Sequence, residues 1–236
     1  MPQETINTNI VHLEGKVFSC KITSKDEQGV TADVRICTAK TVADKDKTKL
    51  ENPLIHRIVV NATGEKASRL QEIEAAIKAA GEVKPNEMPS VKDVVAIDGK
   101  LAVEKNGQPF ILVENDKISF PKKLMMKNSI TLQGKVIETL SNIAYASATI
   151  ELNNPAENGR KVRIPVCISS KDNPRKYAEM SQGKVKNGDV LAVKGPLISQ
   201  KYSNGDREIF MCSVRIANYD NLSQKQTKTK KTQVGL

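Results

Sequence analysis

Cysteine and histidine, the residues that most often form disulfides or hold structural metals, are scarce in this sequence of 236 residues. The four cysteines lie far apart, form no C-x-x-C pair and are accompanied by only two histidines. These spacings fit neither a zinc site nor a disulfide framework. We therefore expect no metal site, and we expect four reduced, buried thiols: Cys20, Cys37, Cys167 and Cys212.

Long apolar runs are also missing. No uninterrupted apolar stretch approaches the ~18 residues needed to span a membrane, and the opening MPQETINTNI does not resemble a signal peptide. We therefore expect a soluble, cytoplasmic protein with no membrane partner.

The sequence lacks the phosphate-binding loops G-x-x-x-x-G-K-[ST] and G-x-G-x-x-G. The segment GKVKNGD at residues 183–189 comes near, but no Lys follows its second Gly. Carboxylates are scattered, and His56 falls in an expected strand, where we expect a hydrogen-bonded core histidine rather than a general base. The protein is therefore expected not to be an enzyme and to need no cofactor.

Positive charge is concentrated in one half of the chain. Residues 1–120 contain 17 Lys and Arg against 18 Asp and Glu, whereas residues 121–236 contain 20 against 9. The final KQTKTKKTQVGL adds lysines without any acid, but the rest of the second half is basic as well. A solvated surface is the simple interpretation, yet a bias confined to one half favours a polyanionic partner for that half.

The chain contains an internal repeat. LEGKV at residues 13–17 returns as LQGKV at residues 132–136. Three more pairs match in the same order: ADVRI with ATIEL, HRIVV with VRIPV, and VVAIDG with VLAVKG. Matches that keep their order while their spacing drifts indicate a duplication with loop insertions, so the chain is built twice from one plan.

Each copy is expected to contain five strands and one helix. In the second copy, residues 143–152 and 160–167 alternate apolar with polar, as half-buried strands do. A short helix is expected over residues 174–182, with Asp172 or Asn173 as its N-cap and Pro174 in its first turn.

Two strands then follow, joined at Asn204-Gly205, a strong hairpin signal. The first copy repeats the order with a longer helix over residues 65–80 and a hairpin at Asn106-Gly107. This order predicts an all-β fold class with one helix per barrel: two tandem five-stranded barrels of the OB type.

Residues 128–220 resemble a bacterial single-stranded DNA-binding protein of the SSB family. The resemblance is carried by ITLQGKV at residues 130–136, NGDVLAVKGPL at residues 187–197 and KYSNGDR at residues 201–207, and in the first copy by IHRIVV at residues 55–60. It implies OB-fold domains over residues 7–120 and 128–220, of which the charge counts make the first near-neutral and the second basic. The lysine-rich residues 221–236 are expected to form a basic, disordered tail.

The resemblance also implies a binding site. The family stacks bases on outward aromatic side chains and passes phosphates along outward Lys and Arg. Tyr202 stands where the family usually has a Trp, and strand alternation directs Tyr145, Lys161 and Arg163 outward. The implied nucleic-acid-binding residues are Tyr145, Lys161, Arg163, Lys194, Lys201, Tyr202 and Arg207.

The chain departs from the family in two respects. It has no Trp, and aromatic residues make up only 3% of it, so that Ile55 and Lys161 occupy the positions of the family's Trp before H-R. The family's acidic C-terminal tip is replaced by a basic end. Binding is therefore expected to depend on charge more than in other members.

These inferences predict a single-stranded DNA-binding protein that is largely independent of base sequence and acts in replication or repair. An RNA-binding OB protein and a tandem OB scaffold that binds no nucleic acid are the alternatives. Because the family commonly works with four barrels, we expect a homodimer. We expect the second barrel to bind and the first not to, since the first has Asp98 in the place of Lys194 and no aromatic before Asn106-Gly107.

Overall fold

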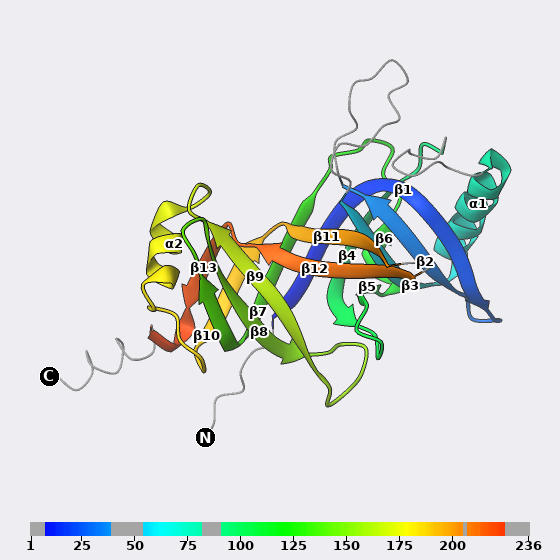
Figure 1. Cartoon of the computed structure of the whole chain (residues 1–236). Helices are drawn as coiled ribbons and strands as arrows, with labels where there is room; N and C mark the ends of the chain where they lie inside the picture. Colours follow the sequence, from blue (N-terminus) through cyan, green and yellow to red (C-terminus); the bar gives the residue numbers. More distant parts are fainter. Residues whose placement is uncertain (1–7, 39–53, 82–90, 205–206, 225–236) are drawn as a thin grey trace, which may run out of the picture. The chain divides into compact units, whose positions relative to one another are not determined.

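The computed structural model describes residues 8–38, 54–81, 91–204 and 207–224 (Figure 1). The described chain forms two compact units. One contains residues 11–128 together with 199–211, and the other contains residues 129–198 and 212–224 with the short segment 8–10. The hairpin segment 199–211 belongs to the same compact unit as residues 11–128. The domain bounds expected from the sequence therefore stay a prediction.

The first barrel is built from the first half of the chain. Its elements are β1 (Asn9–Lys25), β2 (Val30–Cys37), β3 (Ile55–Ala62), α1 (Gly64–Ala80), β4 (Val94–Val103), β5 (Pro109–Val113), the 3-10 turn η1 (Asn115–Lys117) and β6 (Ile118–Ser119). The strands pair in the order β1-β2-β3-β5-β4, and β4 returns to pair with β1. Every pair is antiparallel except β3 with β5, which is the closure of an OB barrel.

The second barrel repeats this plan. Its elements are β7 (Asn128–Ser141), β8 (Tyr145–Asn153), β9 (Lys161–Ser169), α2 (Pro174–Ser181), β10 (Val190–Gly195), β11 (Leu197–Asn204), β12 (Arg207–Arg215) and β13 (Asn218–Asn221). β7 pairs with β8 and β10, β8 pairs with β9, and β9 pairs in parallel with β12. The strand that corresponds to β4 is divided into β10 and β11 at Pro196, a residue that cannot donate to a strand ladder. The predicted all-β fold with two tandem OB barrels is confirmed.

The repeated sequence motif lies where each barrel closes. Gly15 pairs with Val95, and Gly134 pairs with Leu191 at the same place in the second copy. A Cβ on Gly15 would lie 2.4 Å from the carbonyl oxygen of Cys37, and one on Gly134 would lie 2.6 Å from that of Glu151. Both distances are shorter than atoms tolerate, so the first strand of each copy passes its neighbour only with glycine at this position.

A β-bulge follows the motif in both copies. The register shifts between Val17 and Ser19 in β1 and between Val136 and Glu138 in β7. A bulge bends its strand and increases the local twist. The long first strand can therefore pair with one neighbour before the bend and continue along another after it.

Inward and outward side chains alternate along the strands, and the inward ones form the core of each barrel. On β2 the buried positions are Val30, Ala32, Val34 and Ile36, and on β8 they are Ala146, Ala148, Ile150 and Leu152. This is the inward set that the period of two predicts.

The helices begin and end where their sequences predict. Helix α2 begins at Pro174, and the side chain of Asn173 accepts a hydrogen bond from the backbone N–H of Lys176. Helix α1 buries Ala67, Leu70 and Ile73 and ends at Gly81, whose φ of 80° favours glycine. Neither helix is long and apolar enough to cross a membrane in the part of the chain that the structure describes.

The short sixth strands were not predicted. β6 pairs with β4 in the first barrel, and β13 pairs with β10 at the corresponding place in the second. Tyr219 of β13 is buried and lies opposite Val193, just as Ile118 of β6 lies opposite Ile97. The duplication thus extends beyond the five strands of each barrel.

His56 is fully buried in the unit that contains the first barrel. Its Nε2 lies 2.8 Å from the Thr38 hydroxyl and its Nδ1 lies 2.8 Å from the Ser199 hydroxyl. One ring nitrogen of a neutral imidazole donates and the other accepts, so two hydroxyl groups satisfy it. Burial lowers the pKa of His56 to about 3. His56 is therefore the hydrogen-bonded core histidine that its place in a strand predicted.

His56 should make stability depend on pH. Its pKa of about 3 in the folded protein lies below the ordinary value of 6.5, so the folded state favours the neutral ring. This contribution is complete above pH 6.5 and is lost as the pH falls toward 3, by about 1.4 kcal/mol per pH unit. Between pH 7 and pH 5.5, the free energy of unfolding from urea titrations should fall more steeply in the wild type than in His56→Gln. His12→Gln removes the other histidine and is the matched control; equal pH dependence in the wild type and His56→Gln would contradict the assignment.

Candidate functional site

The candidate site is the outer face of the second barrel, formed by the outward side chains of β7, β8, β9 and β12. One row across this face consists of Leu140, Ser147, Cys167 and Arg215 on successive strands. Residues opposite each other in neighbouring strands point to the same side of a sheet. Tyr145 lies one step further along β8, opposite Ser169, and is 54% exposed.

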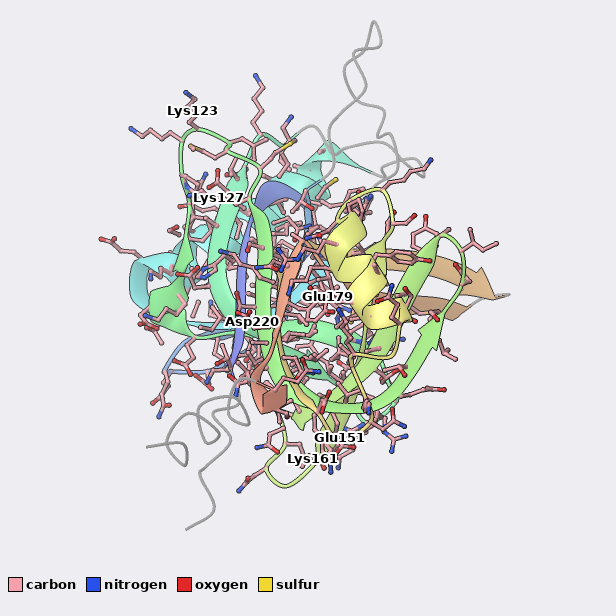
Figure 2. The ribbon with its side chains drawn as sticks, turned by 90° about the vertical axis from the view of Figure 1, so that its left-hand side faces the viewer. Lys123, Lys127, Glu151, Lys161, Glu179 and Asp220 are labelled. Atoms are coloured by element: carbon pink, nitrogen blue, oxygen red, sulfur yellow. The ribbon has the colours of Figure 1, made fainter. Side chains whose placement is uncertain are left out.

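The other end of the face is charged. Lys161 lies opposite Asn153 and Arg163 lies opposite Glu151. Figure 2 shows Lys161 and Glu151 at the same end of this barrel. Both cations are exposed, as the alternation predicted: Arg163 is 71% exposed and its Nε lies 3.7 Å from a Glu151 carboxylate oxygen, while Lys161 donates to the Asn153 side chain. An exposed ion pair of this length is weak, so Arg163 can exchange Glu151 for a phosphate.

Arg215 is a cation on this face that the sequence reasoning missed. Its Nε and Nη2 donate to the two carboxylate oxygens of Asp172 at 2.7 Å and 2.8 Å, and its side chain is 53% exposed. The hydrogen bond to Asp172 raises the pKa of Arg215. The sequence did contain a signal for Arg215, because a polar residue between the apolar Val214 and Ile216 is expected to point outward from a strand. Both neighbours are buried in the structure.

The turn between β7 and β8 presents apolar side chains beside Tyr145. The Asn142 side chain accepts from the backbone N–H groups of Ala144 and Tyr145. The Tyr177 hydroxyl of α2 lies 2.6 Å from the Asn142 carbonyl oxygen. On this well-anchored turn Ile143 is 95% exposed. A single exposed apolar side chain is common on protein surfaces, so Ile143 by itself does not identify a contact surface.

Three of the seven predicted site residues lie on the outer face. Tyr145 is at one end of it, and Lys161 and Arg163 are at the other. Lys194 is exposed but lies beyond β7, on β10, opposite Thr131 and Asn218. The remaining three, Lys201, Tyr202 and Arg207, have side chains outside the described part of the structure.

The sequence repeat aligns Arg57 with Arg163, but the strand registers place Ile55 at the position of Arg163 and Arg57 at that of Pro165. Arg57 also points outward from the third strand of its barrel, but its contacts differ from those of Arg163. Arg57 donates to Asp33 and to Glu104, each at 2.7 Å, and its guanidinium carbon lies 5.9 Å from the centre of the Phe110 ring. Only 17% of the side chain is exposed. Burial opposes the charge, but the hydrogen bonds that Arg57 donates to both carboxylates raise its pKa. Two acids therefore already neutralise this arginine.

The corresponding surface of the first barrel carries other side chains. The strand registers place Thr31 at the position of Tyr145 and Leu112 at that of Arg215. A hollow of about 400 Å³ lies beside Thr31, and its lining includes Asp26, Asn61 and Glu114. At the position of Lys194, Asp98 accepts from His12 at 2.5 Å. Acidic side chains on this surface oppose the approach of a phosphate.

In the part of the chain that the structure describes, the cysteines and acids do not form a metal site. Cys20 and Cys37 are buried and Cys167 and Cys212 are partly buried, all as free thiols. Burial raises the pKa of Cys20 and of Cys212 to about 12, which keeps both protonated at neutral pH. Within the described residues, no group of three or more His, Cys, Asp and Glu could hold a metal ion.

Comparisons with known proteins add to this description. No family model and no curated protein matches the sequence. The fold is similar to that of the wild-type single-stranded DNA binding protein from Thermus aquaticus, with a TM-score of 0.55 and 15% identity over 91% of this chain and 93% of that one. A deletion mutant of the same protein gives a TM-score of 0.55 and 16% identity over 91% and 94%. The single-stranded DNA complex of the Plasmodium falciparum SSB matches 40% of this chain and 91% of its own, with a TM-score of 0.32 and 15% identity. The Thermus similarities establish that the chain has an SSB-like OB fold.

The outward arginines of the two third strands, Arg57 and Arg163, should differ in their importance for stability. Arg57→Ala leaves Asp33 and Glu104 without their shared partner, and we expect it to lower the free energy of unfolding by about 2 kcal/mol. Arg163→Ala removes one long, exposed ion pair and should change stability by less than about 0.5 kcal/mol. Urea denaturation of both variants measures the difference; equal losses would mean that Arg57 is not the structural member of the pair.

Proposed function

We propose that the second barrel binds single-stranded DNA through its outer face, largely independently of base sequence, in replication or repair. The observation that carries this proposal is the arrangement of that face: exposed Tyr145 and Arg215 lie at one end, and exposed Lys161 and Arg163 lie at the other. The SSB-like fold supports it, since two solved structures of the single-stranded DNA binding protein from Thermus aquaticus share this architecture.

The two ends offer the two contacts that a single strand requires. A base stacked on an aromatic ring contributes about 1–3 kcal/mol whatever its identity, because every base has a flat face. Cations that neutralise phosphates release counterions, so that binding weakens as salt rises. Lys201, Tyr202 and Arg207 stay predicted contacts, and the homodimer stays a predicted assembly.

Fluorescence anisotropy of the full chain separates this function from its alternatives. The titrations use labelled oligo-dT, an RNA of equal length and a DNA duplex, each at two salt concentrations. Single-stranded DNA should bind most tightly. Equal affinity for the duplex would indicate a bulk electrostatic surface, stronger binding of the RNA would favour an RNA-binding protein, and the absence of binding at low salt would favour a protein-interaction scaffold.

Lys161 and Arg163 should account for part of the salt dependence. Changing both to Ala should flatten the slope of log K against log salt by about 1.4, because each phosphate contact to a single strand contributes about 0.7. The same variant should weaken binding to every base sequence about equally. Lys184→Ala with Lys186→Ala removes two exposed lysines elsewhere on the same barrel and is the matched control. An unchanged slope in the first double variant would mean that the phosphates take another path.

We further propose that the second barrel provides most of the affinity. Three observations on the first barrel support this proposal: Arg57 is neutralised by two carboxylates, Asp98 occupies the position of Lys194, and Glu114 lines a hollow on the surface. In the full chain, Lys21→Ala with Lys100→Ala removes two exposed cations of the first barrel and should change the affinity for oligo-dT less than twofold. Lys161→Ala with Arg163→Ala should weaken it at least tenfold under the same low-salt conditions. Comparable losses in the two double variants would show that both barrels share the strand.

A further inference from the structure

Arg215 is held in one orientation. Its Nε and Nη2 form a bidentate pair with Asp172, at 2.7 Å and 2.8 Å. A guanidinium bound through two parallel hydrogen bonds lies in the plane of its carboxylate and cannot rotate freely. About half of the side chain is nevertheless exposed, so a flat cation with a fixed plane is presented on the outer face.

The carboxylate partner is fixed as well. Asp172 donates its backbone N–H to the Ser169 carbonyl oxygen at 3.2 Å, at the end of β9. The adjacent Asn173 caps α2, and its side-chain amide donates to the Ala217 carbonyl oxygen at 3.1 Å, just beyond β12. The chain on both sides of the ion pair is therefore anchored, and the guanidinium is positioned before any ligand arrives.

Arg215 and Tyr145 lie on either side of a shallow stretch of surface, called the floor here, that is formed by short side chains. Tyr145 lies on β8 opposite Ser169 of β9, and Arg215 lies on β12 opposite Cys167 of β9. Two strand spacings, about 10 Å, separate their backbones across the sheet. The side chains between them are short: Ser147, Cys167 and Ser169. Leu140 borders the floor on β7 and is 64% exposed.

We propose that Tyr145 and Arg215 form the walls of a subsite that takes one nucleobase of the bound strand, with Leu140 at its edge. This inference rests on the proposed binding of single strands and assigns one end of the face to a base. A guanidinium stacks on aromatic and heterocyclic faces. Asp172 compensates the charge of Arg215 and occupies two of its donors, so the side chain is suited to stacking more than to holding a phosphate.

This assignment divides the face by the kind of contact. The Tyr145–Arg215 end adds affinity that depends little on salt, whereas the Lys161–Arg163 end supplies the salt-dependent contacts to phosphates. The first barrel lacks the subsite, since Thr31 and Leu112 occupy the positions that correspond to Tyr145 and Arg215.

The test compares the full chain with the Tyr145→Ala and Arg215→Lys variants. Each is titrated with labelled oligo-dT and with an oligomer of equal length that carries abasic sites, at two salt concentrations. Arg215→Lys keeps the positive charge but removes the planar group and the bidentate pair. Arg175→Lys changes an exposed arginine of α2 in the same way and is the matched control. Thermal melting establishes that each variant is folded.

Both variants should weaken oligo-dT binding by about 5-fold to 100-fold, the range of one lost stacking contact. They should leave the abasic oligomer and the salt slope unchanged, and Arg175→Lys should behave as the wild type. Because the two walls hold one base, the double variant should lose less than the product of the single losses.

Three results would overturn the subsite. Equal weakening of the base-containing and abasic oligomers by Arg215→Lys would make Arg215 a phosphate contact. Unchanged oligo-dT affinity in both folded variants would remove the subsite while leaving the proposed function intact. Failure of the wild-type chain to bind oligo-dT at low salt would refute the proposed function and the subsite with it.

Discussion

In both barrels the first strand must run against two neighbours, one on each side, and the rest of the structure depends on this close passage. Gly15 and Gly134 allow it, because a Cβ at either position would overlap a backbone carbonyl oxygen of the neighbouring strand. The bulge that follows then bends the strand, at Val17 in one copy and at Val136 in the other. The barrel can close only where backbone contact and bend occur together, so the most similar segments of the duplicated chain are those that close it.

The outward side chains are not subject to this constraint, and they make different contacts in the two copies. Arg57 and Arg163 both point outward from the third strand of their barrel, yet two carboxylates hold the first, whereas the second keeps one distant acid. A charge already compensated inside the protein gives little attraction to a phosphate, whereas an exposed, weakly paired charge keeps it. The difference in net charge between the halves therefore understates the difference between their surfaces.

In the pair of Arg215 with Asp172, compensation of the positive charge has a second consequence. The carboxylate weakens the guanidinium as a point charge and at the same time fixes its plane. A loosely held arginine would attract phosphates from many directions, while a fixed one presents a defined flat surface beside Tyr145. Rigid groups lose little conformational freedom when a ligand binds, which favours the contacts they are already oriented to make.

The duplication, the all-β class and the order of strands and helix could be predicted from the amino-acid sequence, because they follow from local periodicity and turn chemistry. The same holds for the outward direction of Tyr145, Lys161 and Arg163. The sequence also predicted His56 as a core residue, but it could not provide Ser199, its hydrogen-bond partner far along the chain. Nor could it show that Glu151 lies opposite Arg163, that Asp172 holds Arg215, or that Lys194 stands apart on β10. Strand register and barrel closure bring residues from distant parts of the sequence together. The alternation of a strand fixes which side a residue faces, but it does not fix which residue of another strand lies beside it, so these contacts depend on the folded chain.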